Sequence, residues 1–226
     1  MRRRYLQICV CLFFLAVVIA GAEAKAPKGG ADRASGKAGT RTNSPAEEWF
    51  WKGVALEKAG RYQEAAEAFG RTIELEPRHD WAYKHYGVVL NKLGKFKQAI
   101  EYLDKAIELN PKYSKAYNNR GVAYGKLGNH RQALKDFTAA LDINPGYAEA
   151  HYNRGVANAR LNNHKQAVKD YSAAIKLDPR DAMSYYMRGL AYEALGKKKQ
   201  SIEDLKTAAR LGDRDAQQLL QKKGNP

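Results

Sequence analysis

The segment NNRGVAYGKLG at residues 118–128 returns, partly changed, as YNRGVANARLN at residues 152–162. The two copies lie 34 residues apart, and each keeps a glycine in a pattern of apolar residues spaced three and four positions apart. This spacing predicts an amphipathic helix. A fixed period of 34 residues also predicts a repeat architecture, so the fold depends on how far the period extends.

The period extends from Ala46 through five copies. Glycines recur at Gly53, Gly87, Gly121, Gly155 and Gly189, and prolines follow them at Pro77, Pro111, Pro145 and Pro179. Each copy holds two amphipathic segments of 14 residues, such as 114–127 and 130–143. The turn between them carries a residue suited to the left-handed conformation that often ends a helix, namely Gly60, Gly94, Gly128, Asn162 or Gly196. The glycine inside the first segment lowers helix propensity, which predicts close packing of the two helices.

This pattern resembles the tetratricopeptide repeat (TPR), with its W-x2-L-G-x2-Y segment followed by A-x3-F and a proline. The resemblance covers five copies, at 46–79, 80–113, 114–147, 148–181 and 182–213. It implies an all-α fold, a right-handed superhelix of stacked helix-turn-helix units. Residues 214–226 hold one more amphipathic segment, which we expect to cap the last repeat, and the tail. Eleven helices and no sheet are predicted.

The first 24 residues have the three parts of a secretory signal. Arg2 to Arg4 form a basic start, residues 6–20 are an apolar run, and Ala22-Glu23-Ala24 fits a cleavage site. We expect export by the general secretory route to the periplasm or beyond, with no membrane span after cleavage. An uncleaved N-terminal anchor is the alternative. Both cysteines lie in the apolar run, so the mature chain would have no disulfide and no thiolate metal site.

Residues 25–45 carry five cations, the single acid Asp32 and no large apolar residue, which predicts a flexible basic linker. The whole chain of 226 residues has a formal charge of +15. This charge supports an alternative function, in which the linker and the domain bind anionic envelope polymers or a lipid surface. Nucleic acid is not an expected partner, because the signal removes the protein from the cytoplasm.

An arginine precedes the internal glycine in three copies, where TPR proteins usually have leucine. The same three copies carry an aspartate sixteen residues later, giving Arg120 with Asp136, Arg154 with Asp170, and Arg188 with Asp204. We expect each arginine to pair with the aspartate of its own or an adjacent repeat. The alternative is that the arginine stems cover apolar surface while their charged heads stay in water. Both interpretations make these residues part of the scaffold.

Five histidines are the only candidates for metal binding or acid-base chemistry. His130 and His164 replace packing aromatic residues of other copies, and His85 stands without a second histidine or an acidic cluster at ligand spacing. The recurring glycines do not form a phosphate-binding loop. We therefore predict no catalytic residue, no metal site, no cofactor and no enzymatic activity.

In TPR proteins, as the resemblance implies, the first helices of the repeats line a concave groove that holds an extended peptide or a partner helix. The residues expected to face this groove are Phe50, Val54, Lys58, Trp81, Lys84, Val88, Asn91, Lys92, Lys115, Asn118, Val122, Lys126, Tyr152, Val156, Arg160, Met183, Tyr186 and Leu190. They form an aliphatic floor with aromatic anchors and a cationic rim, which favours an acidic partner. The resulting prediction is a protein-binding scaffold within a bacterial envelope assembly, whose partner, pathway and oligomeric state the sequence leaves open.

Overall fold

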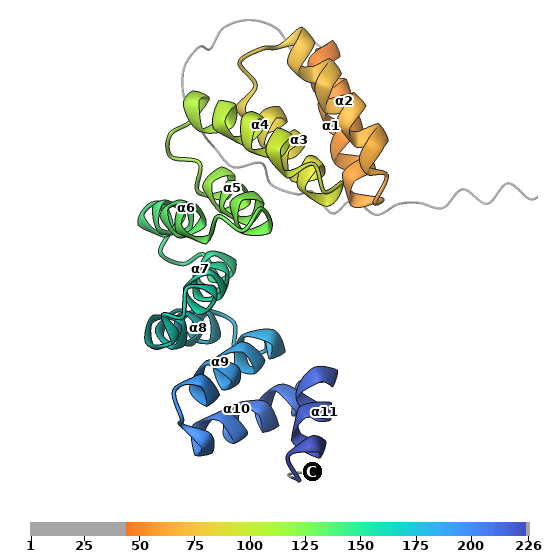
Figure 1. The fold of residues 1–226 in the computed structure, drawn as a ribbon. Coiled ribbons are helices and arrows are strands. Elements are labelled where there is room, and N and C mark those ends of the chain that lie inside the picture. Colours follow the sequence, from red (N-terminus) through yellow and green to blue (C-terminus); the bar gives the residue numbers. More distant parts are fainter. Residues whose placement is uncertain (1–43, 225–226) are drawn as a thin grey trace, which may run out of the picture. The chain divides into compact units, whose positions relative to one another are not determined.

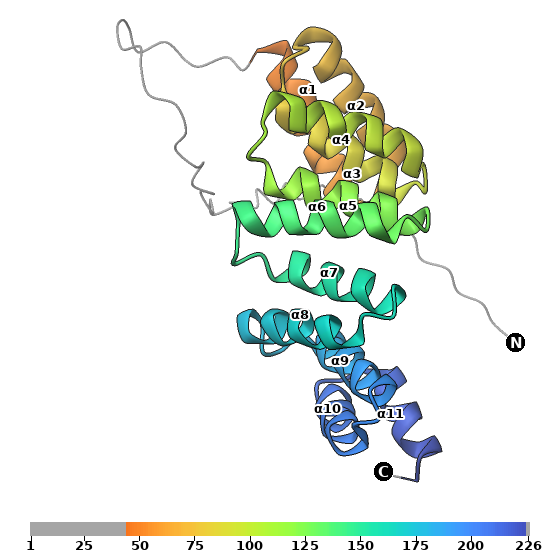
Figure 2. The same ribbon diagram turned by 60° about the vertical axis from the view of Figure 1, so that its left-hand side comes forward.

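The computed structural model describes residues 44–224, so the predicted signal peptide and nearly all of the predicted linker lie outside the described residues. Within this range the chain forms eleven α-helices (Figures 1 and 2). Their bounds are α1 Pro45–Lys58, α2 Tyr62–Leu75, α3 Asp80–Lys92, α4 Phe96–Leu109, α5 Ser114–Lys126, α6 His130–Ile143, α7 Ala148–Arg160, α8 His164–Leu177, α9 Ala182–Ala194, α10 Lys198–Arg210 and α11 Arg214–Lys222. The all-α prediction and the count of eleven helices are confirmed for residues 44–224.

The helices pack as consecutive pairs, α1 with α2 through α9 with α10, and each pair also packs against the next. Odd-numbered helices also contact each other, from α1 through α9, while even-numbered helices make their main contacts with the odd-numbered helices beside them. Five helix-turn-helix units thus stack in one direction, as Figure 2 shows for α5 to α10. The odd helices form the inner row of the solenoid and the even helices form the outer row.

The turn inside each repeat has the predicted backbone conformation. Gly60 has a φ of 74°, and Asn162, which replaces glycine in the fourth repeat, has a φ of 61°. Asn162 is the one residue other than glycine with a positive φ among residues 44–224. Asparagine tolerates this region better than other side chains, so the turn survives the substitution.

The internal glycine of each repeat is a site of close approach between the paired helices. A Cβ added at Gly121 would lie 2.7 Å from a ring carbon of Phe137, and one added at Gly155 would lie 2.7 Å from a ring carbon of Tyr171. Phe137 and Tyr171 are 3% and 0% exposed. The missing side chain therefore makes room for the largest core residue of the outer helix, and this packing offsets the low helix propensity of glycine.

Some predicted boundaries shift by a residue or two. Ser44 and Pro45, assigned to the linker, are the N-cap and the first residue of α1, and Ser44 forms a capping box with Glu47. The inner helices end earlier than predicted, because Leu127 is the C-cap of α5 and not its last residue. At the other end, Asp213 caps α11 through the backbone amide of Ala216.

The cores of the solenoid are contained within the repeats and the last helix. The hydrophobic clusters of the described residues are all formed by residues between 46 and 220, and residues 42–226 form one compact unit. α11 completes the last cluster with the buried Ala216 and Leu220, as a capping helix should. Residues 42–226 thus hold all the hydrophobic clusters of the described residues and can be studied as a folded fragment. None of the helices within residues 44–224 has the length and apolar character needed to cross a bilayer.

Candidate functional site: the inner groove

The predicted groove residues fall into columns that repeat along the inner helices, and each column has its own exposure. Val88, Val122 and Val156 are half-buried and form the floor. One solvent-facing column holds Trp81, Lys115 and Met183, and it also holds Glu149, which had not been predicted to face the groove. The rim is a column of exposed cations at the ends of the inner helices, namely Lys58, Lys92, Lys126 and Arg160.

One column of predicted groove residues holds Phe50, Lys84, Asn118, Tyr152 and Tyr186. Its first three members do not lie on the accessible surface of the groove. Phe50 is 3% exposed, Lys84 is 8% exposed and Asn118 is 0% exposed, so these three do not lie on the groove surface where the sequence placed them. The column lies between adjacent inner helices, and the next repeat covers it. Only Tyr152 and Tyr186, farther along the same column, remain half-buried.

Phe50 belongs to an aromatic cluster at the N-terminal end of the solenoid. Its ring centroid lies 4.7 Å from that of His79, 6.0 Å from that of Phe69 and 6.5 Å from that of Trp81. Trp81 is 40% exposed, so it can contact a ligand while its ring also packs on this cluster. The cluster joins α1, α2 and α3, which makes Phe50 a core residue.

Lys84 forms a polar chain with His85 and Glu57 instead of facing the groove. Lys84 Nζ lies 2.7 Å from His85 Nε2, and His85 Nδ1 lies 2.6 Å from Glu57 Oε2. Because a carboxylate only accepts hydrogen bonds, Nδ1 carries the ring hydrogen and donates a hydrogen bond to Glu57, while Nε2 accepts one from Lys84. Burial lowers the pKa of Lys84 to about 8, and burial also lowers the pKa of His85. His85, which could have faced the groove, therefore helps to join α1 and α3.

Asn118 performs a similar joining role between the third and fourth repeats. Its Nδ2 donates to Glu149 Oε1 at 3.1 Å and to the Tyr147 hydroxyl at 3.3 Å. Its Oδ1 accepts from Asn153 Nδ2 at 3.0 Å. These bonds tie α5 to the start of α7 and satisfy the buried amide.

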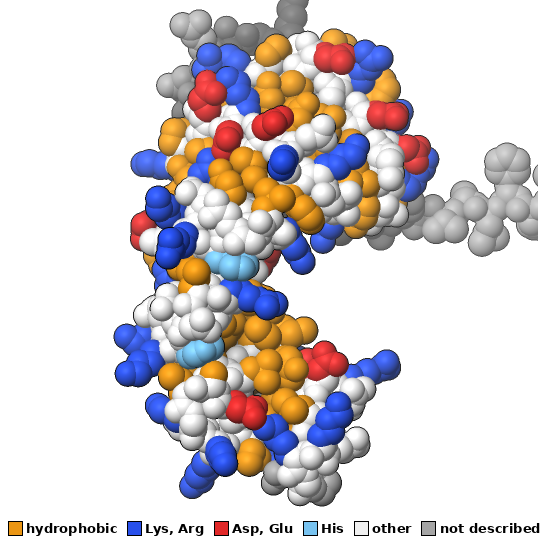
Figure 3. Space-filling model, viewed as in Figure 1, with side chains coloured by type: hydrophobic (Ala, Val, Ile, Leu, Met, Phe, Trp, Pro, Cys, Tyr) orange, Lys and Arg blue, Asp and Glu red, His pale blue; other side chains and the backbone are white. Residues whose placement is uncertain are grey.

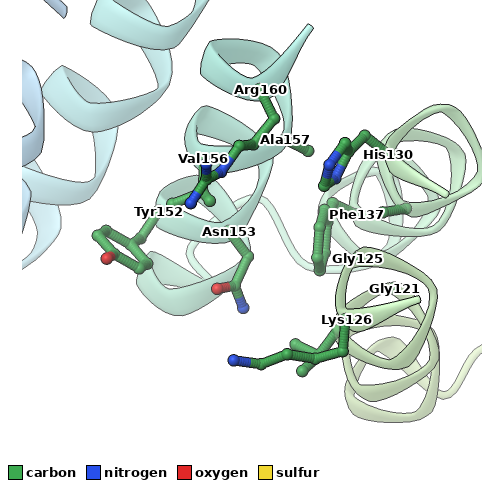
Figure 4. A pocket seen from close by; sticks show the side chains of 12 residues that line it. Gly121, Gly125, Lys126, His130, Phe137, Tyr152, Asn153, Val156, Ala157 and Arg160 are labelled. Atoms are coloured by element: carbon green, nitrogen blue, oxygen red, sulfur yellow. The ribbon is translucent and has the colours of Figure 1, made fainter. Parts of the chain in front are cut away.

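A hollow of about 320 Å³ opens in the groove between α5, α6 and α7 (Figure 4). It brings together five predicted groove residues, which are Val122, Lys126, Tyr152, Val156 and Arg160. Figure 4 shows Lys126 from α5 and Arg160 from α7 on opposite sides of the hollow, with Phe137 from α6 between them. The hollow also has lining residues that the sequence did not single out as ligand contacts, among them Gly125, His130 and Asn153.

The column of Gly125 contains a signal that could have located the hollow. The equivalent positions of the other repeats hold Glu57, Asn91, Ala159 and Glu193. Gly125 adds no side chain, and even a Cβ placed there would come no nearer than 4.0 Å to Ala133 Cβ. Among the five repeats Gly125 is the one member of this column without a side chain, and the hollow opens beside it.

The lining of the hollow combines apolar surface with positive charge. Val122, Val156 and Phe137 supply an apolar wall, Lys126 and Arg160 supply two cations, and the described residues that line the hollow include no aspartate or glutamate. Figure 3 shows hydrophobic side chains gathered over α9, near the next section of the groove, with cationic side chains beside them. Such a site suits a ligand that has an apolar body and a negative charge.

The three arginines that precede the internal glycine lie against the aspartates of their own repeats. The distances are 2.7 Å from Arg120 Nη2 to Asp136 Oδ1, 2.7 Å from Arg154 Nη2 to Asp170 Oδ1, and 2.7 Å from Arg188 Nε to Asp204 Oδ2. The aspartate side chains are 3%, 2% and 8% exposed in that order. Hydrogen bonding to Asp204 raises the pKa of Arg188. Each pair therefore bridges the inner and the outer helix of one repeat.

Residues 44–224 contain no group of three or more His, Cys, Asp and Glu side chains that could hold a metal ion. The two cysteines lie outside the described residues.

The described residues form an α-solenoid of helix pairs with a groove along its inner helices. Family models described as tetratricopeptide repeats match residues 46–79, 87–128, 118–182 and 159–216. Together these matches cover most of the chain, and the chain belongs to the tetratricopeptide repeat family.

Several solved structures share this fold. A crystal structure of MamA protein has a TM-score of 0.65 and 23% sequence identity, covering 76% of this chain and 94% of that one. MamA from Desulfovibrio magneticus RS-1, from residue 41 to its end, has a TM-score of 0.68 and 20% identity, covering 75% and 96%. YrrB, described as a TPR protein with an unusual peptide-binding site, has a TM-score of 0.64 and 21% identity, covering 78% and 92%. At these identities the likeness shows the fold alone. Comparison with curated protein sequences gives no significant match.

Proposed function

We propose that this protein is a non-catalytic scaffold that binds an acidic peptide or partner helix in its inner groove, centred on the hollow between α5, α6 and α7. The proposal rests on the charge of the hollow. Lys126 and Arg160 lie on opposite sides of its apolar wall, and none of the described residues that line it is an aspartate or a glutamate. Protein binding is the common use of TPR solenoids, and the description of YrrB names a peptide-binding site for that protein.

The recognition is expected to combine an anchor and a charge. An apolar side chain of the ligand would enter between Val122 and Val156, and a neighbouring carboxylate would lie within reach of Lys126 and Arg160. A buried anchor supplies most of the binding energy at such sites, and the cations speed association and favour acidic partners.

The test uses residues 42–226 and a fluorescent synthetic peptide of alternating glutamate and leucine. The Lys126→Glu/Arg160→Glu variant reverses the two cations at the hollow, and Lys58→Glu/Lys92→Glu reverses the same column in the first two repeats. We expect the first variant to weaken binding about tenfold or more and the second to weaken it much less. Equal losses would mean that bulk charge, and not the hollow, binds the peptide.

A second variant probes the shape of the hollow. Gly125→Glu places in the third repeat the residue that the first and fifth repeats have at this position, as Glu57 and Glu193. Glutamate is a better helix former than glycine, so the protein should fold at least as well. Peptide binding should fall sharply, because the new side chain fills the hollow and repels acidic ligands. Unchanged binding would place the site elsewhere.

We further propose that the scaffold works outside the cytoplasm, within an envelope assembly. The support is the basic start, apolar run and cleavage-like site of residues 1–24, which lie outside the described residues. Expression of the full chain followed by cell fractionation and mass analysis of the N-terminus tests this. A mature chain beginning near Lys25 in the exported fraction supports the proposal, and a cytoplasmic chain with an intact N-terminus contradicts it.

A further inference from the structure

The two edges of the solenoid carry different charge. Every turn inside a repeat lies at one edge and every loop between repeats lies at the other, because each inner helix runs antiparallel to its outer partner. In Figure 2 the loop between α6 and α7 lies on the left and the turn between α7 and α8 lies on the right. The edge that carries the turns inside the repeats is called the turn edge, and residues 91–99, 125–135 and 159–169 form it in the middle repeats. The edge that carries the loops between repeats is called the loop edge, and it is formed by residues 74–82, 108–116, 142–150 and 176–184.

The turn edge is uniformly cationic. Its three segments contain nine lysines and arginines and no aspartate or glutamate. The four segments of the loop edge contain eight acids and five cations. The positive charge of the solenoid is therefore concentrated along one edge of three consecutive repeats. Figure 3 shows cationic side chains outnumbering acidic ones on the side over α6 and α8.

One column of this edge places cations at the N-termini of the outer helices, where acidic residues are usually favoured. The second residue of four consecutive outer helices is a cation, Lys97, Arg131, Lys165 or Lys199, and all four side chains are exposed. The first turn of a helix has a partial positive charge, so acids stabilise it and cations destabilise it. The described parts of α4, α6, α8 and α10 have no acid in the first turn, and none of the four cations forms an ion pair within residues 44–224. Exposed cations that stabilise neither their helix nor a partner side chain are free to meet an external anion.

Apolar side chains lie between these cations. Leu127, in the turn of the third repeat, is 44% exposed. It lines a hollow of about 340 Å³ together with Lys95 and Lys97. Leu195 takes the same place in the fifth repeat and lines a hollow of about 430 Å³ with Lys165 and Lys169. The exposed Leu127 and the half-buried Leu195 of the fifth repeat thus lie beside cations of the turn edge.

We propose that the turn edge is a docking surface for an anionic lipid bilayer, with the cations at the headgroups and the leucines at the headgroup boundary. This goes beyond binding in the inner groove. The turn edge shares Lys92, Lys126 and Arg160 with the groove rim, but Lys97, Arg131 and Lys165 lie on the outer helices α4, α6 and α8. Lysines and arginines near an anionic bilayer are attracted to it, and leucines among them add apolar contact. Within the three turn segments described here, no aromatic side chain is exposed, so the stacking platforms typical of single-stranded nucleic acid binding are missing.

The test measures sedimentation of residues 42–226 with vesicles of equal parts phosphatidylcholine and phosphatidylglycerol, and with vesicles of phosphatidylcholine alone. Lys97→Glu/Arg131→Glu/Lys165→Glu reverses three cations of the turn edge. Its matched control, Arg78→Glu/Lys112→Glu/Arg180→Glu, reverses three exposed cations in one column of the loop edge, with the same change in net charge.

We expect wild type and the control to sediment with the anionic vesicles, and the turn-edge variant to bind about tenfold or more weakly. Binding should weaken as salt is added. The turn-edge variant should also melt at the same temperature or higher, because its new glutamates suit the helix N-termini. Loss of lipid binding by a protein of undiminished stability cannot come from unfolding.

Three results would overturn the proposal. One is that both variants lose binding equally, which would assign the attraction to net charge. Another is that wild type binds neutral and anionic vesicles equally tightly, or binds neither kind. The third is that duplex DNA competes for the turn edge more tightly than the anionic vesicles at the same salt concentration, which would identify a nucleic acid surface.

Discussion

The second and fifth repeats join their two helices at the same position by different chemistry. In the second repeat the ring centroids of Tyr86 and Tyr102 lie 4.2 Å apart. In the fifth repeat Arg188 Nε donates to Asp204 at 2.7 Å. Both repeats place a leucine of the outer helix against the internal glycine. The close approach at the glycine therefore sets the spacing of the helices, and the neighbouring bridge can be aromatic or ionic.

The ionic bridges also reach toward the preceding repeat. Arg188 Nη1 donates to the Ser172 hydroxyl at 3.0 Å, and Arg120 Nη1 donates to Asp104 Oδ1 at 2.6 Å. In a solenoid, stability is nearly a sum of repeat terms and nearest-neighbour interfaces. Arg120 and Arg188 therefore each contribute to the stability of their own repeat and to that of the interface with the preceding repeat.

The largest expected effect comes from breaking one ionic bridge. Asp170 accepts hydrogen bonds from Arg154 and from Asn158 Nδ2, and its side chain is 2% exposed. Asp170→Ala leaves a partly buried guanidinium without its partner, so the free energy of unfolding should fall by about 3 to 5 kcal/mol in chemical denaturation. The control is Asp104→Ala, whose carboxylate is 52% exposed and pairs with Arg120. This control should lower the free energy of unfolding by about 0 to 1 kcal/mol. Similar losses for both variants would show that burial does not determine how much these ion pairs stabilise the fold.

The close approach at the glycine should matter equally in repeats with and without an ionic bridge. Gly53→Ala and Gly155→Ala each place a Cβ 2.7 Å from an aromatic carbon, of Phe69 and Tyr171 respectively. Each should lower the free energy of unfolding by about 1 to 3 kcal/mol through overpacking. Gly125→Ala, with open space around it, should instead raise stability by up to about 1 kcal/mol. Thermal melts and denaturant titrations of the three variants check this, and a stabilising Gly155→Ala would contradict it.

Lys84 and Asn118 occupy equivalent buried positions in the second and third repeats, but only Lys84 can titrate. Its folded pKa of about 8 lies below the unfolded value of about 10.4, so the unfolded chain binds more protons between these values. The free energy of unfolding should therefore rise with pH, by about 2 kcal/mol from about pH 7 to about pH 9.5, relative to Lys84→Met. Parallel pH dependences of wild type and Lys84→Met would show that Lys84 keeps an ordinary pKa.

The smallest effect is expected when one bridge is exchanged for the other. Arg188→Tyr/Asp204→Tyr transfers the tyrosine pair of the second repeat into the fifth, where the internal glycine also faces a leucine. The double variant should unfold within about 1.5 kcal/mol of wild type, because a buried ion pair and an apolar pair of similar size are often nearly equivalent. Arg188→Tyr alone should lose more, since it leaves Asp204 unpaired. A double variant as unstable as the single one would mean that the two bridges are not interchangeable.

The helices, the turns and the partners of the ionic bridges were predictable from the sequence. The apolar spacing and the turn residues are local signals, and the joint occurrence of arginine and aspartate in three repeats indicated which side chains meet. The groove was predicted less completely. The 34-residue period placed Phe50, Lys84 and Asn118 on the inner helices, but it could not show that the following repeat covers them.

The sequence by itself determined the repeat, the eleven helices of residues 44–224 and the left-handed turn at Asn162, because each depends on residues close together in the chain or on a fixed spacing. Only the tertiary structure decided which inner positions reach solvent and where the groove deepens. Exposure there depends on the separation of helices from different repeats, which is set by side chains tens of residues apart. The hollow beside Gly125 is an example. Its lining joins Lys126 and Phe137 of the third repeat with Val156 and Arg160 of the fourth.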